Sequence, residues 1–285
     1  MAFTESLEFR GQPAIALRLP QGDRVRVALH GAHVLSWQTA DGTERLYLSP
    51  QALFDGQSAI RGGVPVCWPQ FNMRGPLVKH GFVRNLPWQV VASPDAAETD
   101  TLRLRLSDSP ATRAFWPEHF EAELAVQLAP QRLRLTLTVR NTGHTEDRPW
   151  SFTAALHSYL RVQDATTARL EGLEGAARWD AVRDVRGTET ASALRFGEEF
   201  DSVYAAPGTP LHLLDGHRRL QIAQSAGCTE TVVWNPGPAL SARLTDMPDD
   251  GWRHMLCVEA ACIDTPVLLA PGAQWQAWQD LLVQA

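Results

Sequence analysis

The chain has 285 residues, with 26 lysines and arginines against 32 aspartates and glutamates, and therefore a net charge of −6. This acidic balance argues against nucleic acid or an anionic membrane as the main partner and favours a small molecule. No apolar run approaches the roughly 20 residues of a membrane span, and the N-terminal MAFTESLEFRGQ shows no basic segment followed by an apolar one. We therefore expect a cytoplasmic protein.

Neither the cysteine spacing nor the composition indicates a domain boundary. The four cysteines are scattered without paired metal spacing, and each is surrounded by apolar residues, which predicts buried free thiols. Length alone allows one large domain or two of ordinary size. Because the chain contains no repeat of fixed period and no low-complexity linker, we expect a single domain over residues 1–285.

Short alternating segments fill the first half of the chain. Apolar and polar residues alternate between turn-rich stretches such as PQGD and ADGTE, which predicts antiparallel strands and hairpins. Leu133, Leu135 and Leu137 alternate with arginine and threonine, as a sheet with one solvated face requires. Strands are predicted at 14–20, 24–30, 33–40, 45–49, 64–68, 88–93, 101–107, 122–129 and 132–143.

The second half of the chain continues this pattern. Further strands are predicted at 151–162, 219–224, 229–236, 254–263 and 265–272. Short helical turns are expected only at 109–117 and 247–255, where Pro248 suits an early helical position and Asp246 or Asp249 a cap. Strands and helices do not alternate in βαβ units, which disfavours a parallel sheet. The predicted fold class is all-β, a large antiparallel β-sandwich with a few short helices.

Two later strands each contain one residue suited to proton transfer. Strand alternation places Phe152 and Leu156 on one face, and His157 with Tyr159 on the other. Taken alone, a strand histidine beside a tyrosine is more often a structural residue than a catalyst. Glu259 is the single charged group in MLCVEAACI, and a carboxylate there lies either on a solvated face or in a cleft. The absence of neighbouring polar residues in that strand favours the cleft.

Residues 60–88 concentrate positive charge in an acidic chain. Arg61, Arg74, Lys79 and Arg84 occur there with His80. Neighbouring basic residues more often form a solvated surface, but here they are mixed with glycine, proline and aromatic residues, which favours an anion site. Arg61 precedes Gly62-Gly63, which indicates a turn before a buried strand or a close approach of ligand.

The remaining polar residues point to no other chemistry. Asp201 in FDSVYAA is interpreted either as a turn or cap residue or as an acceptor of ligand hydroxyls. No HxH or HExxH spacing occurs, so a metal site would need ligands from scattered strands, and we expect none. The sequence also lacks a P-loop, a GxGxxG motif and a GxSxG elbow.

Several of these motifs together resemble a known family. GAHVLSWQ, IRGGVPVCWPQF, KHGFVRNLPW, ALHSYLRV, FDSVY, VVWNP and CVEAACI occur in this order from about residue 30 to the C-terminus. They are similar to the glucose-6-phosphate 1-epimerase (hexose-6-phosphate mutarotase) branch of the aldose 1-epimerase superfamily. The chain departs from that pattern at Gln70, Phe71 and Asn72, where the family more often has Trp-Phe-Gly after the Trp-Pro pair.

The resemblance implies a galactose-mutarotase-like β-sandwich that needs no cofactor and interconverts the anomers of a hexose 6-phosphate. His157 would be the general acid at the ring oxygen and Glu259 the general base at the anomeric hydroxyl, on opposite sides of the ring. His157 would then be protonated near neutral pH, favoured by a carboxylate such as Asp201, and Glu259 ionised.

The resemblance also implies the binding residues. Arg61 and Arg84 would hold the phosphate, His80 the sugar ring and Asp201 the sugar hydroxyls. Lys79 and Arg74 are added from their charge alone.

Two alternatives remain at this point. The first is a non-catalytic β-sandwich that binds a sugar phosphate, which would not need an acid/base pair. The second is a metal-dependent cupin-like enzyme, which the histidine spacing disfavours. We expect a monomer without nucleic-acid or membrane partners.

Overall fold

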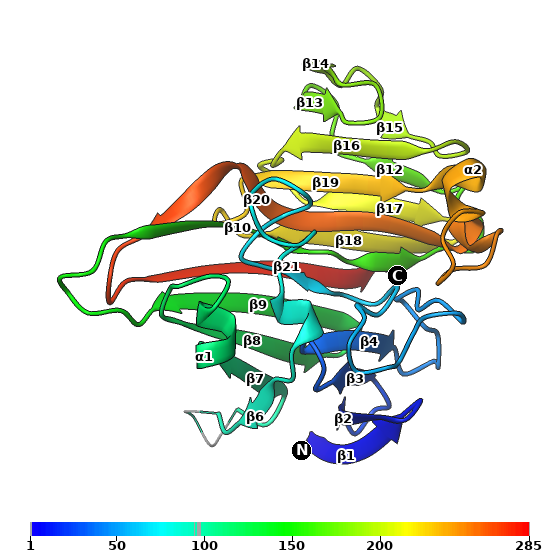
Figure 1. Ribbon diagram of the computed structural model, residues 1–285. Coiled ribbons are helices and arrows are strands. Elements are labelled where there is room, and N and C mark those ends of the chain that lie inside the picture. Colours follow the sequence, from blue (N-terminus) through cyan, green and yellow to red (C-terminus); the bar gives the residue numbers. More distant parts are fainter. Residues whose placement is uncertain (1, 94, 96–97, 285) are drawn as a thin grey trace.

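Two large antiparallel sheets pack against each other in the computed structural model, which describes residues 2–93, 95 and 98–284 (Figure 1). The eight-stranded sheet has the order β14 (Val185–Thr188), β13 (Ala177–Asp180), β16 (Phe200–Ala205), β19 (Glu230–Asn235), β20 (Met255–Leu269), β10 (Trp150–Leu156), β5 (Val66–Cys67), and β11 (Tyr159–Arg161) also pairs with β20. The nine-stranded sheet has the order β15 (Ala193–Leu194), β12 (Arg169–Glu171), β17 (Leu211–Asp215), β18 (Arg218–Gln224), β21 (Gln274–Gln284), β9 (Arg132–Asn141), β8 (Phe120–Ala129), β7 (Thr101–Ser107), β6 (Gln89–Val91). The predicted all-β fold class is confirmed.

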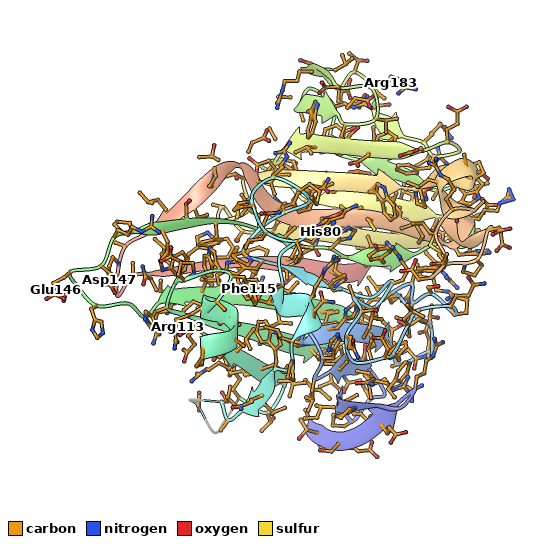
Figure 2. The ribbon with its side chains drawn as sticks, in the orientation of Figure 1. His80, Arg113, Phe115, Glu146, Asp147 and Arg183 are labelled. Carbon is orange, nitrogen blue, oxygen red and sulfur yellow. The ribbon has the colours of Figure 1, made fainter. Side chains whose placement is uncertain are left out.

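The N-terminal strands form a third, smaller sheet. It has the order β1 (Phe3–Phe9), β2 (Gln12–Arg18), β3 (Arg24–Ala28), β4 (His33–Gln38), and its buried valines join the core shared by the two large sheets. Side chains fill the space between the layers, and Glu146 and Asp147 mark the tip of the long β9–β10 connection (Figure 2).

The core follows the predicted alternation closely. In β8 every second residue is buried, and β9 buries Leu133, Leu135 and Leu137 opposite its arginines. These leucines meet Leu256 and Val258 of the eight-stranded sheet in one large apolar cluster. Burial of apolar area contributes roughly 25 cal/mol per Å², so this shared interior is the main force that holds the two sheets together.

Several predicted strands differ from those observed. Residues 45–49 make only isolated bridges, through Leu46 and Leu48. The segments 254–263 and 265–272 do not form two strands, because β20 runs on through Leu269 as 15 residues. The predicted strand 151–162 is instead two strands, β10 and β11, interrupted at His157 and Ser158. Short or half-buried strands such as β14 and β21 were not predicted, because they show no clear alternation.

The helices are few and short, as expected. α1 (Pro110–Arg113) begins after Ser109, whose side chain accepts a hydrogen bond from the Thr112 N–H in a capping box. Within 247–255 the chain forms a 3-10 helix, η2 (Gly251–His254), preceded by Asp250, so the roles predicted for Pro248, Asp246 and Asp249 are wrong. α2 (Gly237–Ser241) and the 3-10 helix η1 (Val83–Asn85) were not predicted.

All four cysteines are free and buried, as predicted. Among the described residues, the helices are too short to cross a lipid bilayer.

Candidate active site

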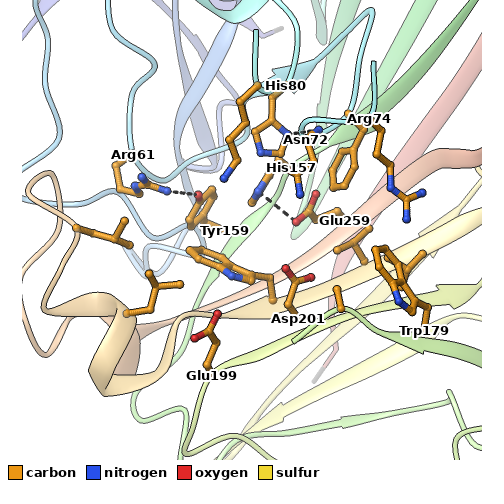
Figure 3. Close-up of a pocket in the computed structure, with 18 residues that line it drawn as sticks. Arg61, Asn72, Arg74, His80, His157, Tyr159, Trp179, Glu199, Asp201 and Glu259 are labelled. Carbon is orange, nitrogen blue, oxygen red and sulfur yellow. Dashed lines mark hydrogen bonds and ion pairs between the residues drawn. The ribbon is translucent and has the colours of Figure 1, made fainter. Parts of the chain in front are cut away.

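A cavity of about 280 Å³ lies on the outer face of the eight-stranded sheet. Its floor comes from β16, β19, β20 and the β10–β11 break, and side chains from the segment 61–80, among them Asn72 and His80, cover it (Figure 3). His157, Glu259, Arg61, His80, Asp201, Lys79 and Arg74, all predicted as site residues, line it. Of the predicted site residues, only Arg84 lies outside this cavity.

Glu259 is placed by the alternation of β20. Leu256 and Val258 point into the main core, so Cys257 and Glu259 point to the opposite face, as predicted. Glu259 is 1% exposed, which confirms the cleft and excludes the solvated face. Burial first, and the charge of Asp201 second, raise the pKa of Glu259 well above its ordinary value.

His157 lies at the β10–β11 break. Its N–H donates to Pro65 O at 3.0 Å, and the Tyr159 N–H donates to Gly63 O at 2.9 Å, so the covering segment fixes the break. His157 nevertheless keeps the predicted face, because it lines the cavity while Leu156 belongs to the core.

The two proton-transfer candidates touch directly. His157 Nε2 lies 3.2 Å from Glu259 Oε1. Burial, followed by the charges of His80 and Arg84, lowers the pKa of His157 well below its ordinary value. Both shifts favour the neutral forms of the pair, in which Glu259 rather than His157 carries the shared proton, whereas the expected roles of acid and base place that proton on His157.

His80 belongs to the covering segment and has an unusual backbone. Its φ of 65° lies in the left-handed region, which is strained for a residue with a side chain. Its Nδ1 accepts the Asn72 N–H at 3.2 Å, so in the neutral ring Nε2 carries the hydrogen. Burial, then the charges of Arg84 and Lys79, lowers the pKa of His80 to about 3. His80 is thus a neutral donor beside His157, at a ring separation of 5.5 Å.

Aromatic side chains form the walls. Tyr159 stacks on His157 with ring centroids 4.8 Å apart and an interplanar angle of 11°. Trp234 meets His157 edge-on at 6.1 Å, and Phe71 meets His80 edge-on at 5.0 Å. Sequence reasoning gave these residues no role in the site, although Tyr159 and Trp234 lie in the quoted motifs ALHSYLRV and VVWNP.

Arg61 is held by two partners. Its Nε donates to both carboxylate oxygens of Asp246 at 3.1 and 3.2 Å, and its Nη1 donates to Tyr159 Oη at 3.1 Å. At Gly62-Gly63, where the sequence predicted a turn or a close approach of ligand, the close neighbour is the protein's own backbone. A Cβ at Gly63 would lie 2.1 Å from Val34 O.

Arg84 lines a hollow that adjoins the cavity. Arg61 and Lys79 border both spaces, and Arg243 lines the hollow as well. Arg84 Nη2 donates to Lys79 O at 3.0 Å. Arg243 was missed because it lies far from the other cations in sequence. The structure therefore groups four cations around the hollow beside the cavity, with Asp246 as their neighbouring carboxylate.

Arg74 and Asp201 lie away from that group. Arg74 pairs with Asp264 at 2.6 Å and lies 4.6 Å from the ring centre of Trp179, across the cavity from Arg61 (Figure 3). Asp201 lies within β16, which excludes a turn or cap. Burial, then the charge of Glu199, raises the pKa of Asp201 to about 6.

The departure at Gln70 has a structural role. The buried Gln70 amide donates to Asn72 O and Leu77 O, both at 3.0 Å, and accepts the Leu77 N–H at 2.8 Å. These bonds shape the loop that places Asn72 and His80 over the sheet.

Comparison with known proteins identifies the family. The model of the aldose 1-epimerase family matches residues 13–282. The chain belongs to the aldose 1-epimerase family. One family member, from Cenchrus ciliaris, named "putative glucose-6-phosphate 1-epimerase", is 35% identical over 274 residues, which cover 93% of this chain and 83% of the relative. A relative of the same name from Escherichia coli K12 is 38% identical, with coverages of 82% and 78%.

Solved structures agree with this membership. The crystal structure of a "putative mutarotase (YeaD)" from Salmonella typhimurium is 31% identical and superimposes with a TM-score of 0.87 over 98% of this chain and 93% of that one. The structure of HI1317, at 22% identity and a TM-score of 0.75 over 99% and 100% of the two chains, shows the same fold.

Proposed function

We propose that this aldose 1-epimerase family member interconverts the α and β anomers of a hexose 6-phosphate, with glucose 6-phosphate as the first candidate. The observation that carries the proposal is the buried 3.2 Å contact between His157 Nε2 and Glu259 Oε1 in a cavity of about 280 Å³. A cavity of this size suits a single small ligand. The relatives named for glucose 6-phosphate support the choice of sugar.

The pair suits reversible ring opening. A shift of the shared proton to His157 leaves Glu259 as a carboxylate base beside an imidazolium acid. Glu259 takes the proton of the anomeric hydroxyl, the C1–O5 bond breaks as C1=O1 forms, and His157 gives its proton to O5. Rotation about C1–C2 and the reverse transfers give the other anomer. Each positioned transfer typically contributes ~10²–10⁴ in rate.

The direct contact suggests a second placement of acid and base. The two groups lie side by side, 3.2 Å apart, whereas the expected roles place them on opposite sides of the sugar ring. O1 and O5 are both bonded to C1, and neighbouring groups can therefore address both oxygens. The pair holds the same number of protons before and after each step, so the chemistry needs no cofactor.

The cation group fits the phosphate. Arg61 and Arg84 are the proposed phosphate residues, with Lys79 beside them and Arg243 added by the structure. Arginine forks suit phosphate oxygens, and Lys79 supplies a point charge. Arg61 keeps one terminal nitrogen, Nη2, outside its bonds to Asp246 and Tyr159.

The rest of the cavity fits the sugar. His80 would donate Nε2–H to the ring, and Asp201 would accept hydroxyl hydrogens. Arg74, which pairs with Asp264 at the other end, is proposed as a wall of the sugar pocket. All these groups come from one chain, and we propose a single domain over residues 1–285 that acts as a cytoplasmic monomer.

Exchange NMR on one protein sample tests the function. Anomer interconversion is measured for glucose, galactose and their 6-phosphates. We expect the largest acceleration for a 6-phosphate. Saturable binding of the 6-phosphates without acceleration would instead establish the non-catalytic binding protein.

A further inference from the structure

A buried thiol adjoins the acid/base pair. Cys257 lies two residues before Glu259 on the same face of β20 and pairs with Tyr159 across the sheet. The Cys257 Sγ, one ring nitrogen of His157 and one carboxylate oxygen of Glu259 all lie within 4.8 Å of one another. In the proposed reaction His157 and Glu259 transfer protons, and Cys257 has no role.

The three donors suit a particular class of cation. Thiolate, imidazole and carboxylate are the usual ligands of Zn²⁺, and its sites with an open position typically have three protein ligands. Two of the donor residues still have an atom that can take a further partner, because His157 Nδ1 and Glu259 Oε2 are buried without a hydrogen-bond partner among the residues described. The cavity lies on the side of His157 and Glu259, where the open position would be.

Charge balance favours the same cation. A thiolate and a carboxylate together bring two negative charges, which a divalent cation neutralises, and this avoids the large cost of burying a net charge.

We propose that His157, Cys257 and Glu259 bind Zn²⁺ and that the bound ion inhibits the enzyme. The ligands come from the β10–β11 break and from β20, which explains why sequence spacing gave no metal signature. Coordination occupies the lone pairs through which His157 and Glu259 would move protons. Metal binding stands by itself, whereas its inhibitory effect rests on the proposed function.

Cobalt spectroscopy tests the binding. Co²⁺ bound to a thiolate shows a sulfur-to-metal charge-transfer band, and tetrahedral Co²⁺ shows strong visible bands. We expect both on titrating the wild-type protein, and we expect Zn²⁺ to abolish them by displacement. Cys257→Ala should remove the charge-transfer band, whereas Cys228→Ala, which changes a buried free thiol outside the site, should retain it.

The folded state of the variants is checked by circular dichroism, and Cys257→Ser provides a second variant of nearly unchanged volume. A wild-type protein without the charge-transfer band, or a Cys257→Ala or Cys257→Ser protein that keeps it, would overturn the site. Loss of the band in Cys228→Ala as well would assign it to a different thiol and also overturn it.

A rate measurement tests the inhibition. Zn²⁺ should slow anomerisation of glucose 6-phosphate, and a chelator should restore the rate. We expect Cys257→Ala to raise the Zn²⁺ concentration for half-inhibition by at least ~10-fold, because one of three ligands is lost. Equal inhibition of wild type and Cys257→Ala would refute the inhibitory site. If the protein accelerates no anomerisation, the proposed function fails, while the cobalt spectra still decide the metal site.

Discussion

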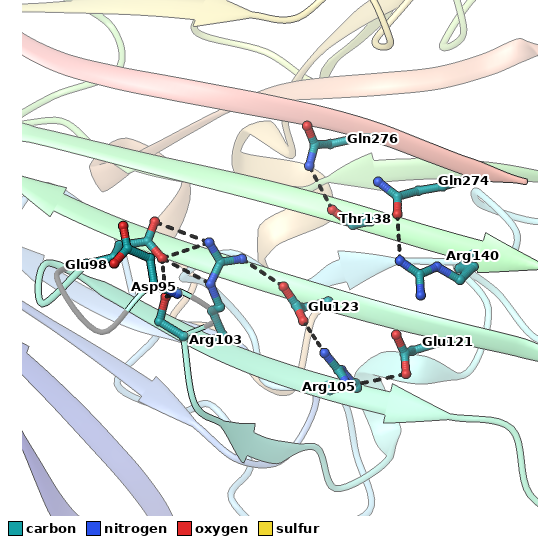
Figure 4. A network of polar contacts seen from close by, with 11 residues as sticks. Asp95, Glu98, Arg103, Arg105, Glu121, Glu123, Thr138, Arg140, Gln274 and Gln276 are labelled. Atoms are coloured by element: carbon teal, nitrogen blue, oxygen red, sulfur yellow. Dashed lines mark hydrogen bonds and ion pairs between the residues drawn. The ribbon is translucent and has the colours of Figure 1, made fainter.

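The outer faces of the two large sheets differ in how their charged side chains are paired and hydrated. On the nine-stranded sheet, charged side chains pair with one another across strands (Figure 4). Arg103 donates to Glu98 and Glu123, and Arg105 pairs with Glu123 and Glu121, at distances of 2.8 to 3.4 Å. These residues are partly exposed, so water and their partners both stabilise the charges.

On the eight-stranded sheet, the covering segment removes most of that water. Glu259 and His157 are at most 7% exposed, and each has one buried polar atom that finds no partner in the described part of the chain. The pKa values of Glu259 and Asp201 are raised and that of His157 is lowered, so the neutral form of each group is favoured. Paired and hydrated charge maintains a surface, whereas buried and incompletely paired charge remains available for chemistry.

The largest expected effect is on the rate of anomerisation, which substitutions on the cavity face should lower and a substitution on the other face should not. We expect Glu259→Gln and His157→Asn each to slow anomerisation of glucose 6-phosphate at least ~100-fold, since each removes a positioned proton transfer. Polarimetry measures the rate, and circular dichroism confirms the fold. Glu123→Gln, the matched change on the nine-stranded sheet, should leave the rate within about twofold. A wild-type rate in either cavity variant would contradict the assigned roles.

Phosphate recognition should give the next largest effect. Arg84→Ala should weaken binding of glucose 6-phosphate by ~10-fold or more, because a charge-assisted hydrogen bond contributes about 1.5–3 kcal/mol. Binding of glucose should change little. Arg84 is a cleaner test than Arg61, whose removal also breaks the contacts with Tyr159 and Asp246. Calorimetric titration measures both ligands, and an equal loss for both would argue against a phosphate site.

A smaller effect concerns stability and pH. The pKa of Asp201 is raised to about 6, so between its ordinary value and about 6 the folded state binds more protons than the unfolded state. Stability therefore falls as pH rises through that window. Asp201→Asn removes the cost and should raise the free energy of unfolding on the order of 1 kcal/mol near neutral pH.

Urea unfolding at about pH 4.5 and about pH 7.5 measures this difference, and the gain should be smaller at the lower pH. An equal gain at both values would show that Asp201 does not titrate in this window.

The smallest effect is expected on the paired face. Glu123→Gln breaks ion pairs with Arg103 and Arg105 that water still reaches, so the free energy of unfolding should fall by less than about 1 kcal/mol. Added salt should reduce the difference further. A loss of several kcal/mol, measured by urea unfolding, would show that this network is as critical to the fold as the buried core.

Alternation predicted the faces of individual strands well. It placed Leu133 in the core and Glu259 on the cavity face, because side chains in a strand alternate whatever the strand pairs with. It did not predict the loss of regular strand at residues 45–49 or the break at His157, where hydrogen bonds to a distant segment interrupt the strand although His157 keeps its predicted face. Those partners follow no local period.

The sequence by itself determined the all-β class, the buried cysteines and, through motifs in order, the family. It also marked Glu259 as the single charged group of an apolar strand, whereas His157 was selected through the resemblance to that family. Only the tertiary structure decided that these two residues touch, that burial favours the neutral form of each, and that Arg243, Trp234 and Cys257 lie beside the predicted groups. Contact distances and pKa values depend on which segments pack together and how much water they exclude, and neither quantity is encoded in the spacing along one strand.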